Sequence, residues 1–186
     1  MVEETLYVVD RKEWRAWLAR NFDRAERAWL IYPRKASGKK RIAYNDAVEE
    51  ALCFGWIDST IKSFDEESSA QRFSPRRAGS SYSQPNKERM KWLLEHDMIH
   101  DSVLEKAKEI ASEIFVFPAD IVAEIKKDDL VWTNYCGFSD SYKRIRLAYI
   151  DVARDLPEEF AKRLRNFIVK TRANKQFGFG GIEKYY

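Results

Sequence analysis

The feature that most constrains the fold is a pair of β-prone runs separated by a short polar segment. Trp56–Phe64 and Ala70–Phe73 flank the sequence Asp-Glu-Glu-Ser-Ser at 65–69. This is the pattern of a β-hairpin with a longer loop. Gly55 precedes the first run and follows a stretch with helical apolar spacing, so a helix is expected to end there.

Side-chain alternation predicts one polar and aromatic face for the first run. Residues two apart point to the same side of a strand, so Trp56, Asp58 and Lys62 are expected on one face. Ile57 and Ile61 are expected on the other.

A basic, turn-rich stretch follows the hairpin. Its Pro, Gly and Ser residues indicate a loop, and Pro85 then suits the first turn of a helix that begins near Ser83. Six cations fall within twenty residues, against the single carboxylate of Glu88: Arg72, Arg76, Arg77, Lys87, Arg89 and Lys91. Guanidinium groups bind planar oxyanions through paired hydrogen bonds, and free amides at a helix start add positive charge.

We therefore expect an anion or carboxylate site on this stretch. Its candidate ligand-binding residues are Trp56, Asp58, Lys62, Arg72, Phe73, Arg76, Arg77, Ser80, Tyr82, Ser83 and Asn86. Trp56, Asp58, Arg72, Arg76 and Asn86 are expected to converge on one concave surface. The alternative is a solvated basic loop, with two structural arginines paired to Asp58 and Asp65.

The same residues resemble a known family. Gly55–Asp58, Gln71–Arg77, Ser80–Ser83 and Asn86-Lys87 are similar in order and spacing to the YdeI/OmpD-associated family, also called bacteriocin-protection proteins. The departures are small: Ser59 replaces a usual Gly, Ser74 a usual Thr, and Tyr82 a usual Trp.

The resemblance extends into the C-terminal half, through Phe117–Asp120 and Thr171–Gly178. It implies a protein associated with envelope stress and bacteriocin resistance. It implies no reaction, cofactor or catalytic residue.

Composition places the chain among globular proteins. A chain of 186 residues can form one domain or two small ones, and 45% hydrophobic residues are enough for a core. No apolar run approaches the roughly 20 residues of a membrane span. The N-terminus lacks an apolar signal core, so we expect a cytoplasmic protein without membrane contact.

The two cysteines and two histidines do not form a recognisable metal motif. Cys53 and Cys136 lack CxxC spacing and are expected to be buried thiols. His96 and His100 are four residues apart, but no third ligand lies near them. We expect no metal and no cofactor.

The pattern along the chain predicts an α+β fold with two parts. Residues 1–115 should form a small antiparallel sheet with the hairpin, and residues 116–186 a helical part packed against it. The seam is expected at Phe115–Pro118. In the tail, Phe177, Phe179 and Tyr185 are too apolar for a free end and are expected to pack on the protein or on a neighbouring copy.

Three classes of function fit these features. The favoured one is a non-enzymatic stress or bacteriocin-protection-type protein that binds an anionic small molecule or carboxylate at the Arg/Trp/Asp site. The second is an enzyme in which Asp58 is the acid or base and Arg72 and Arg76 hold an anionic substrate. Paired-carboxylate chemistry on the helix before Gly55 lacks support, because its acidic residues, Asp46, Glu49 and Glu50, fall mainly on a polar face.

The third class is contact with RNA or DNA. Trp56, Phe73 and Tyr82 would stack on bases, and the arginines would bind phosphates. A net charge of +3 is modest for such a protein, which disfavours this class but leaves it open. The sequence does not indicate an oligomeric state.

Overall fold

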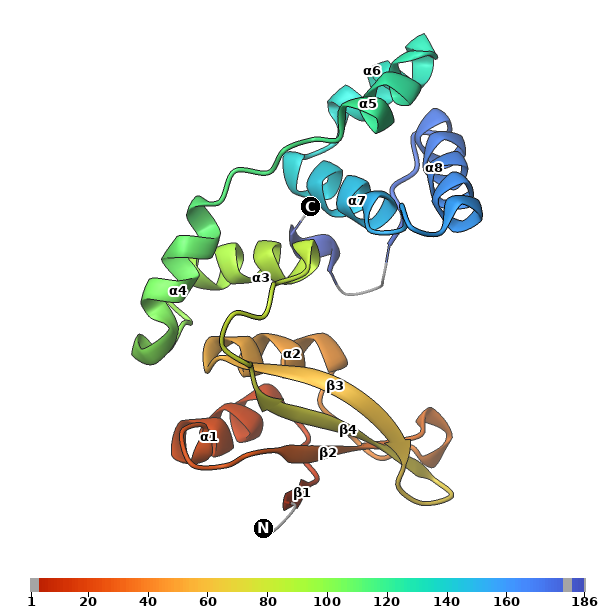
Figure 1. The fold of residues 1–186 in the computed structure, drawn as a ribbon. Coiled ribbons are helices and arrows are strands. Elements are labelled where there is room, and N and C mark those ends of the chain that lie inside the picture. The colour runs from red at the N-terminus through yellow and green to blue at the C-terminus, as the bar shows by residue number, and fades with distance from the viewer. Residues whose placement is uncertain (1–3, 179–181, 186) are drawn as a thin grey trace. The chain divides into compact units, whose positions relative to one another are not determined.

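The computed structural model describes residues 4–178 and 182–185 and shows an α+β fold, as predicted (Figure 1). The chain divides into two compact units. The N-terminal unit comprises residues 1–81 and 90–110, and the helical unit comprises 82–89 and 111–186. The units are not continuous in sequence, since helix α3 has residues in both of them. The expected boundary at 115/116 stays a prediction.

The N-terminal unit contains the sheet and two of its covering helices. Its elements are β1 (Glu4–Leu6), α1 (Arg11–Asn21), β2 (Ala28–Pro33), the 3-10 turn η1 (Lys35–Ser37), α2 (Tyr44–Cys53), β3 (Trp56–Ser63) and β4 (Ser68–Pro75). Helix α3 (Gln84–Glu95) starts in the helical unit and ends in this one, and α4 (Asp101–Ser112) follows.

The sheet has the strand order β1-β2-β4-β3. Strands β3 and β4 form the predicted hairpin, and β4 also pairs antiparallel with β2. Strand β1 instead runs parallel to β2, because helix α1 lies between them in the chain and carries it back to the same end of the sheet. The predicted antiparallel sheet is thus correct for three of the four strands.

A β-bulge overturns the expected alternation along β3. Asp58 pairs with Phe73 and Ile61 pairs with Gln71, with an irregularity between the two pairs. Phe73 and Gln71 are two residues apart, so Asp58 and Ile61 share a face. Lys62 therefore lies on the opposite face from Asp58, because the extra residue in the bulge reverses every later side chain.

Aromatic side chains fill the core between the sheet and its helices. Trp14 on α1 contacts Phe73 with ring centroids 5.5 Å apart, and stacks on Trp17 at 5.2 Å. Trp56 meets both tryptophans edge-on. Helices α1 and α2 also contact each other, so together they cover one face of the sheet (Figure 1).

Besides the start of α3, the described residues of the helical unit form four helices that follow one another closely. They are α5 (Ala119–Lys126), α6 (Asp129–Gly137), α7 (Asp140–Asp151) and α8 (Pro157–Arg172), followed by the 3-10 turn η2 (Glu183–Tyr185). Asp128 caps α6 and Ser139 caps α7 through side-chain hydrogen bonds. The buried core of this unit consists of Ile121, Ile125, Val131, Tyr135, Phe138, Tyr142, Leu147, Ile150 and Phe167.

The tail packs on the helical unit, as predicted for two of its three aromatic residues. The Phe177 ring lies 6.4 Å from that of Phe167, and its backbone N–H donates to the Tyr142 hydroxyl at 3.2 Å. Tyr185 is buried, and the Arg89 guanidinium lies over its ring. Phe179 falls outside the described residues.

Candidate functional site

Two of the predicted ligand-binding residues are part of the core. Trp56 and Phe73 are fully buried, and the Trp56 indole N–H donates to the Phe22 carbonyl at 3.0 Å. Their aromatic surface is used in packing against α1. The sequence could not distinguish a binding tryptophan from a core tryptophan, because both occur at inward-facing strand positions.

Asp58 and Arg72 lie on opposite faces of the sheet. Asp58 is the partner of Phe73, and Arg72 is its neighbour along β4, so alternation directs the two charges to different sides. Asp58 accepts hydrogen bonds from Tyr44 and Gln71, whereas the Arg72 Nε donates to the Ser59 hydroxyl at 2.9 Å.

Lys62 lies on the same face as Arg72, with its ammonium 3.9 Å from the centre of the Trp29 ring. This contact follows from the bulge, which moves Lys62 away from Asp58.

The remaining candidates lie in the loop after β4 and in the first turn of α3. Arg76 donates through Nη2 to the Ser81 carbonyl at 2.6 Å, and the Ser80 hydroxyl donates to the Arg77 carbonyl at 2.8 Å. Asn86 accepts from Arg89 at 2.8 Å. Tyr82, Ser83 and Asn86 belong to the helical unit. A ligand-binding role for this loop stays a prediction.

A pocket of about 340 Å³ opens beside the carboxylate of Asp58, within the N-terminal unit. We call it the strand pocket. Three strands, the segment that leads into α2 and the first residue of α2 supply its lining, which consists of Tyr32, Arg41, Ile42, Ala43, Tyr44, Ile61, Ser69 and Gln71. Tyr44 and Gln71 are the two residues that hydrogen-bond to Asp58, so the carboxylate adjoins the pocket.

Register and backbone contacts explain why these residues meet. Tyr32 pairs with Ser69, Leu30 pairs with Gln71, and Gln71 pairs with Ile61, so the pocket residues of the sheet share one face. The segment before α2 is held over this face, because the Ile42 N–H donates to the Val8 carbonyl at 3.2 Å.

Arg41 places a cation in the lining of the strand pocket. Its Nη1 donates to the Pro33 carbonyl at 2.8 Å, and its guanidinium carbon lies 5.9 Å from the centre of the Tyr32 ring. A guanidinium has five N–H donors, so this anchor leaves others for a ligand. Arg41 itself is exposed.

The Tyr32 hydroxyl is the most unusual group in this pocket. Tyr32 is only 8% exposed, and its hydroxyl is buried without a hydrogen-bond partner among the described residues. Burial raises the pKa of Tyr32, and the nearby Tyr44 and Asp58 raise it further, against a smaller opposing effect of Arg41. The hydroxyl therefore stays a neutral donor at ordinary pH.

Asp58 supplies the negative charge beside this pocket. Its Oδ2 accepts from the Tyr44 hydroxyl at 2.6 Å and, more weakly, from the Gln71 amide at 3.4 Å. The strand pocket thus combines a cation, a neutral donor and an adjacent carboxylate. Sequence reasoning singled out Asp58 but missed Tyr32 and Arg41; a tyrosine on the inward face of a buried strand was the available signal.

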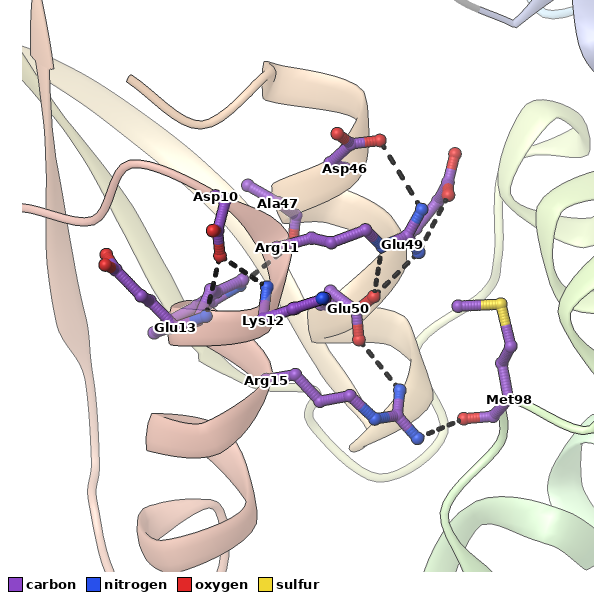
Figure 2. Close-up of polar contacts among 11 residues, drawn as sticks. Asp10, Arg11, Lys12, Glu13, Arg15, Asp46, Ala47, Glu49, Glu50 and Met98 are labelled. Carbon is purple, nitrogen blue, oxygen red and sulfur yellow. Dashed lines mark hydrogen bonds and ion pairs between the residues drawn. The ribbon is translucent and has the colours of Figure 1, made fainter. Parts of the chain in front are cut away.

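A cluster of partly buried ion pairs lies between α1 and α2 (Figure 2). Arg11 and Arg15 on α1 both contact Glu50, at 2.7 and 2.8 Å, and Arg15 also donates to the Met98 carbonyl. Glu49 also lies close to Arg11, at 3.4 Å. These contacts tie the two helices together.

The expectation that Glu49 and Glu50 fall on a polar face is wrong. Glu49 is 0% exposed and Glu50 is 1% exposed. The arginines of α1 compensate the two charges, and a single helix sequence does not reveal a partner on another helix.

Neither a metal site nor a membrane span is found in the described part of the chain. Residues 4–178 and 182–185 contain no group of three or more His, Cys, Asp or Glu side chains that could hold a metal ion. Within the same residues, no helix is both long enough and apolar enough to cross a bilayer.

Two family models match different parts of the chain. A domain of unknown function, DUF8412, matches residues 6–106, which include strands β2 to β4, the strand pocket and the Arg–Glu cluster. The family described as bacteriocin-protection, YdeI or OmpD-associated matches residues 115–174, which are the helices α5 to α8. No curated protein and no solved structure matches the chain.

The second match confirms the family that the sequence resembles, although the motifs at 55–87 lie within the range of the first. The chain belongs to the DUF8412 family, and its helices α5 to α8 match the model of the bacteriocin-protection, YdeI- or OmpD-associated family.

Proposed function

We propose that this is a non-enzymatic protein of the bacteriocin-protection type that binds a small carboxylic acid in the strand pocket. The observation that supports this most strongly is the buried Tyr32 hydroxyl, which has no hydrogen-bond partner among the described residues and lies beside Arg41. The proposed ligand class is the one inferred from the sequence, but the proposed site is the strand pocket in place of the arginine loop.

The energetic argument starts from the unsatisfied hydroxyl. Leaving a buried donor without a partner costs about 1–3 kcal/mol, so a ligand oxygen that accepts from Tyr32 would recover this free energy. The guanidinium of Arg41 would hold the same carboxylate through charge-assisted hydrogen bonds. Binding would thus use donors from two residues that line one pocket.

Asp58 restricts the rest of the ligand. A second negative charge beside this carboxylate would be repelled, so the ligand should carry one carboxylate together with a hydroxyl or ammonium group that can face Asp58. A volume of about 340 Å³ is at the small end of ligand pockets, which range from about 300 to 1,000 Å³. Amino acids and hydroxy acids satisfy both conditions.

The family match supports the general class of the protein. The helical half matches a family named for bacteriocin protection, and neither that name nor the geometry of the strand pocket indicates a reaction. Asp58 would act in this proposal as a fixed acceptor, since Tyr44 and Gln71 already hold its Oδ2.

The experiment compares small acids with their amides in a thermal-shift assay. Amino acids and hydroxy acids that fit should stabilise the wild-type protein by about 2.7 kcal/mol at a concentration of 100 times Kd. The corresponding amides, which lack the carboxylate charge, should give little stabilisation.

Two variants localise the effect. Arg41→Gln should lose the stabilisation, whereas Arg34→Gln, which removes an exposed arginine outside the pocket lining, should keep it. Equal stabilisation of Arg41→Gln and wild type would contradict the proposal. Turnover of a bound acid, followed by chromatography of the mixture, would instead support the enzymatic alternative.

A further inference from the structure

A second pocket, of about 320 Å³, lies wholly within the helical unit. We call it the helix pocket. Helices α7 and α8 and the start of the tail supply its lining, which consists of Arg146, Tyr149, Glu159, Lys162, Arg163, Asn166, Phe177 and Gly178. We propose that the helix pocket is a separate binding site for a small phosphate-bearing molecule.

Charge is the first argument for a phosphate. The lining contains three cations and one carboxylate, which leaves an excess of two positive charges. The carboxylate is Glu159, which pairs with Arg163 at 2.9 Å and with Lys162 at 3.5 Å. A phosphate monoester carries about −1.5 to −2 at neutral pH, so its charge matches this excess better than a single carboxylate does.

The buried arginine is the second argument. Arg146 is only 3% exposed, and its guanidinium carbon lies 5.4 to 5.9 Å from the rings of Tyr142, Tyr149 and Phe177. A cation held among aromatic rings has lost much of its water, and an anion in the adjacent pocket gains a strong interaction with it.

The walls of the helix pocket are held in place before any ligand arrives. Arg163 donates to the Tyr149 carbonyl at 2.7 Å and lies 4.0 Å from the centre of the Tyr149 ring, which joins α8 to α7. The tail is fixed by the hydrogen bond from the Phe177 N–H to Tyr142. Asn166 adds an amide donor to the lining.

Inorganic phosphate and phenyl phosphate, titrated calorimetrically into the full-length protein, test the proposal. Both should bind saturably, and phenyl phosphate more tightly, because Phe177 and Tyr149 give the pocket apolar walls. Lys162→Gln should weaken binding by about twofold to fivefold, the size expected for one exposed charge. Lys170→Gln removes an equal charge from the same helix, outside the pocket lining, and should change nothing.

Arg146→Gln should abolish phosphate binding, and circular dichroism establishes whether this variant folds. If it does not fold, Lys162→Gln and its control still decide the question. Equal affinities of Lys162→Gln and Lys170→Gln, or titrations without saturation, would overturn the proposal. Arg41→Gln should leave phosphate binding unchanged, so failure at the helix pocket and failure at the strand pocket are distinguishable.

Discussion

Replacement of Glu50 by Gln tests the partly buried ion pairs between α1 and α2 (Figure 2). Glu50 accepts from Arg11 through Oε1 and from Arg15 through Oε2. Glutamine has the same shape but only one acceptor oxygen, so its amide N–H₂ would face one of the two guanidinium groups. One charge-assisted hydrogen bond is then lost and two donors are brought together.

The expected loss in the free energy of unfolding depends on how exposed the two arginine side chains are. Breaking a fully buried pair costs about 3–5 kcal/mol, because a buried charge is left without compensation. Here the two arginine side chains are 31% and 38% exposed, so water can partly solvate them after the change. We therefore expect Glu50→Gln to lower the free energy of unfolding by about 2–3 kcal/mol.

Urea denaturation followed by tryptophan fluorescence measures this loss, because the N-terminal unit contains the tryptophan cluster of α1 and β3. Glu67→Gln is the matched control, since its pair with Lys39 is more than half exposed on both sides. The control should cost under about 1 kcal/mol.

A double-mutant cycle separates the contribution of the pair from that of the side chains. Arg15→Met and Glu50→Gln should show a coupling energy of about 0.5–3 kcal/mol, as expected for residues in one network. The reasoning would be refuted if Glu50→Gln and Glu67→Gln had equal stability and Glu50→Gln showed no coupling energy with Arg15→Met.

Three further predictions concern the thiols, an ion pair and the tail. Burial raises the pKa of Cys53 to about 12, whereas Cys136 is exposed, so a thiol reagent at pH 8 should modify one cysteine in the folded protein and two in urea; two rapid modifications without urea would contradict this. The hydrogen bond from Arg154 lowers the pKa of Asp120, so this pair stabilises the protein fully above about pH 4, the pKa of the unfolded state, and less as the pH falls through the lower folded pKa. Arg154→Gln should therefore make the free energy of unfolding depend less on pH in this range. An unchanged pH dependence would count against the pair. Deletion of residues 177–186 should lower the melting temperature, because the tail packs on the helical core, and an unaltered melting temperature would disprove a stabilising role.

The fold was predictable where a signal is local. The hairpin followed from two β-prone runs around a polar segment, and Asp10 caps α1 as a helix-start residue should. The parallel pairing of β1 and the bulge after Asp58 were not predictable, because both depend on which strands meet in the folded protein. The bulge has a greater consequence for the candidate site than the parallel pairing, since it places Lys62 on the opposite face from Asp58.

The candidate site was predictable only in part, for the same reason. Asp58 is a polar residue in a strand and was visible in the sequence. Tyr32 and Arg41 are brought to it by strand register and by the segment before α2, and no spacing in the chain relates the three. The cationic loop drew attention because charges cluster there in sequence, yet Arg76 and Ser80 make contacts within the loop itself.

Substitution of Tyr32 by Phe tests the strand pocket most directly, because it removes the hydroxyl and nothing else. In the ligand-free protein the variant should be as stable as wild type or more stable, since a buried donor without a partner is eliminated. Its affinity for the best-binding carboxylic acid should fall.

Tyr44→Phe is the control: it removes the hydroxyl that hydrogen-bonds to Asp58, so it should lower the stability of the ligand-free protein by about 0.5–1.5 kcal/mol. Urea denaturation and calorimetric titration of both variants give the two quantities. Unchanged or higher stability with weaker binding in Tyr32→Phe is the predicted result; lower stability with unchanged binding would contradict the account.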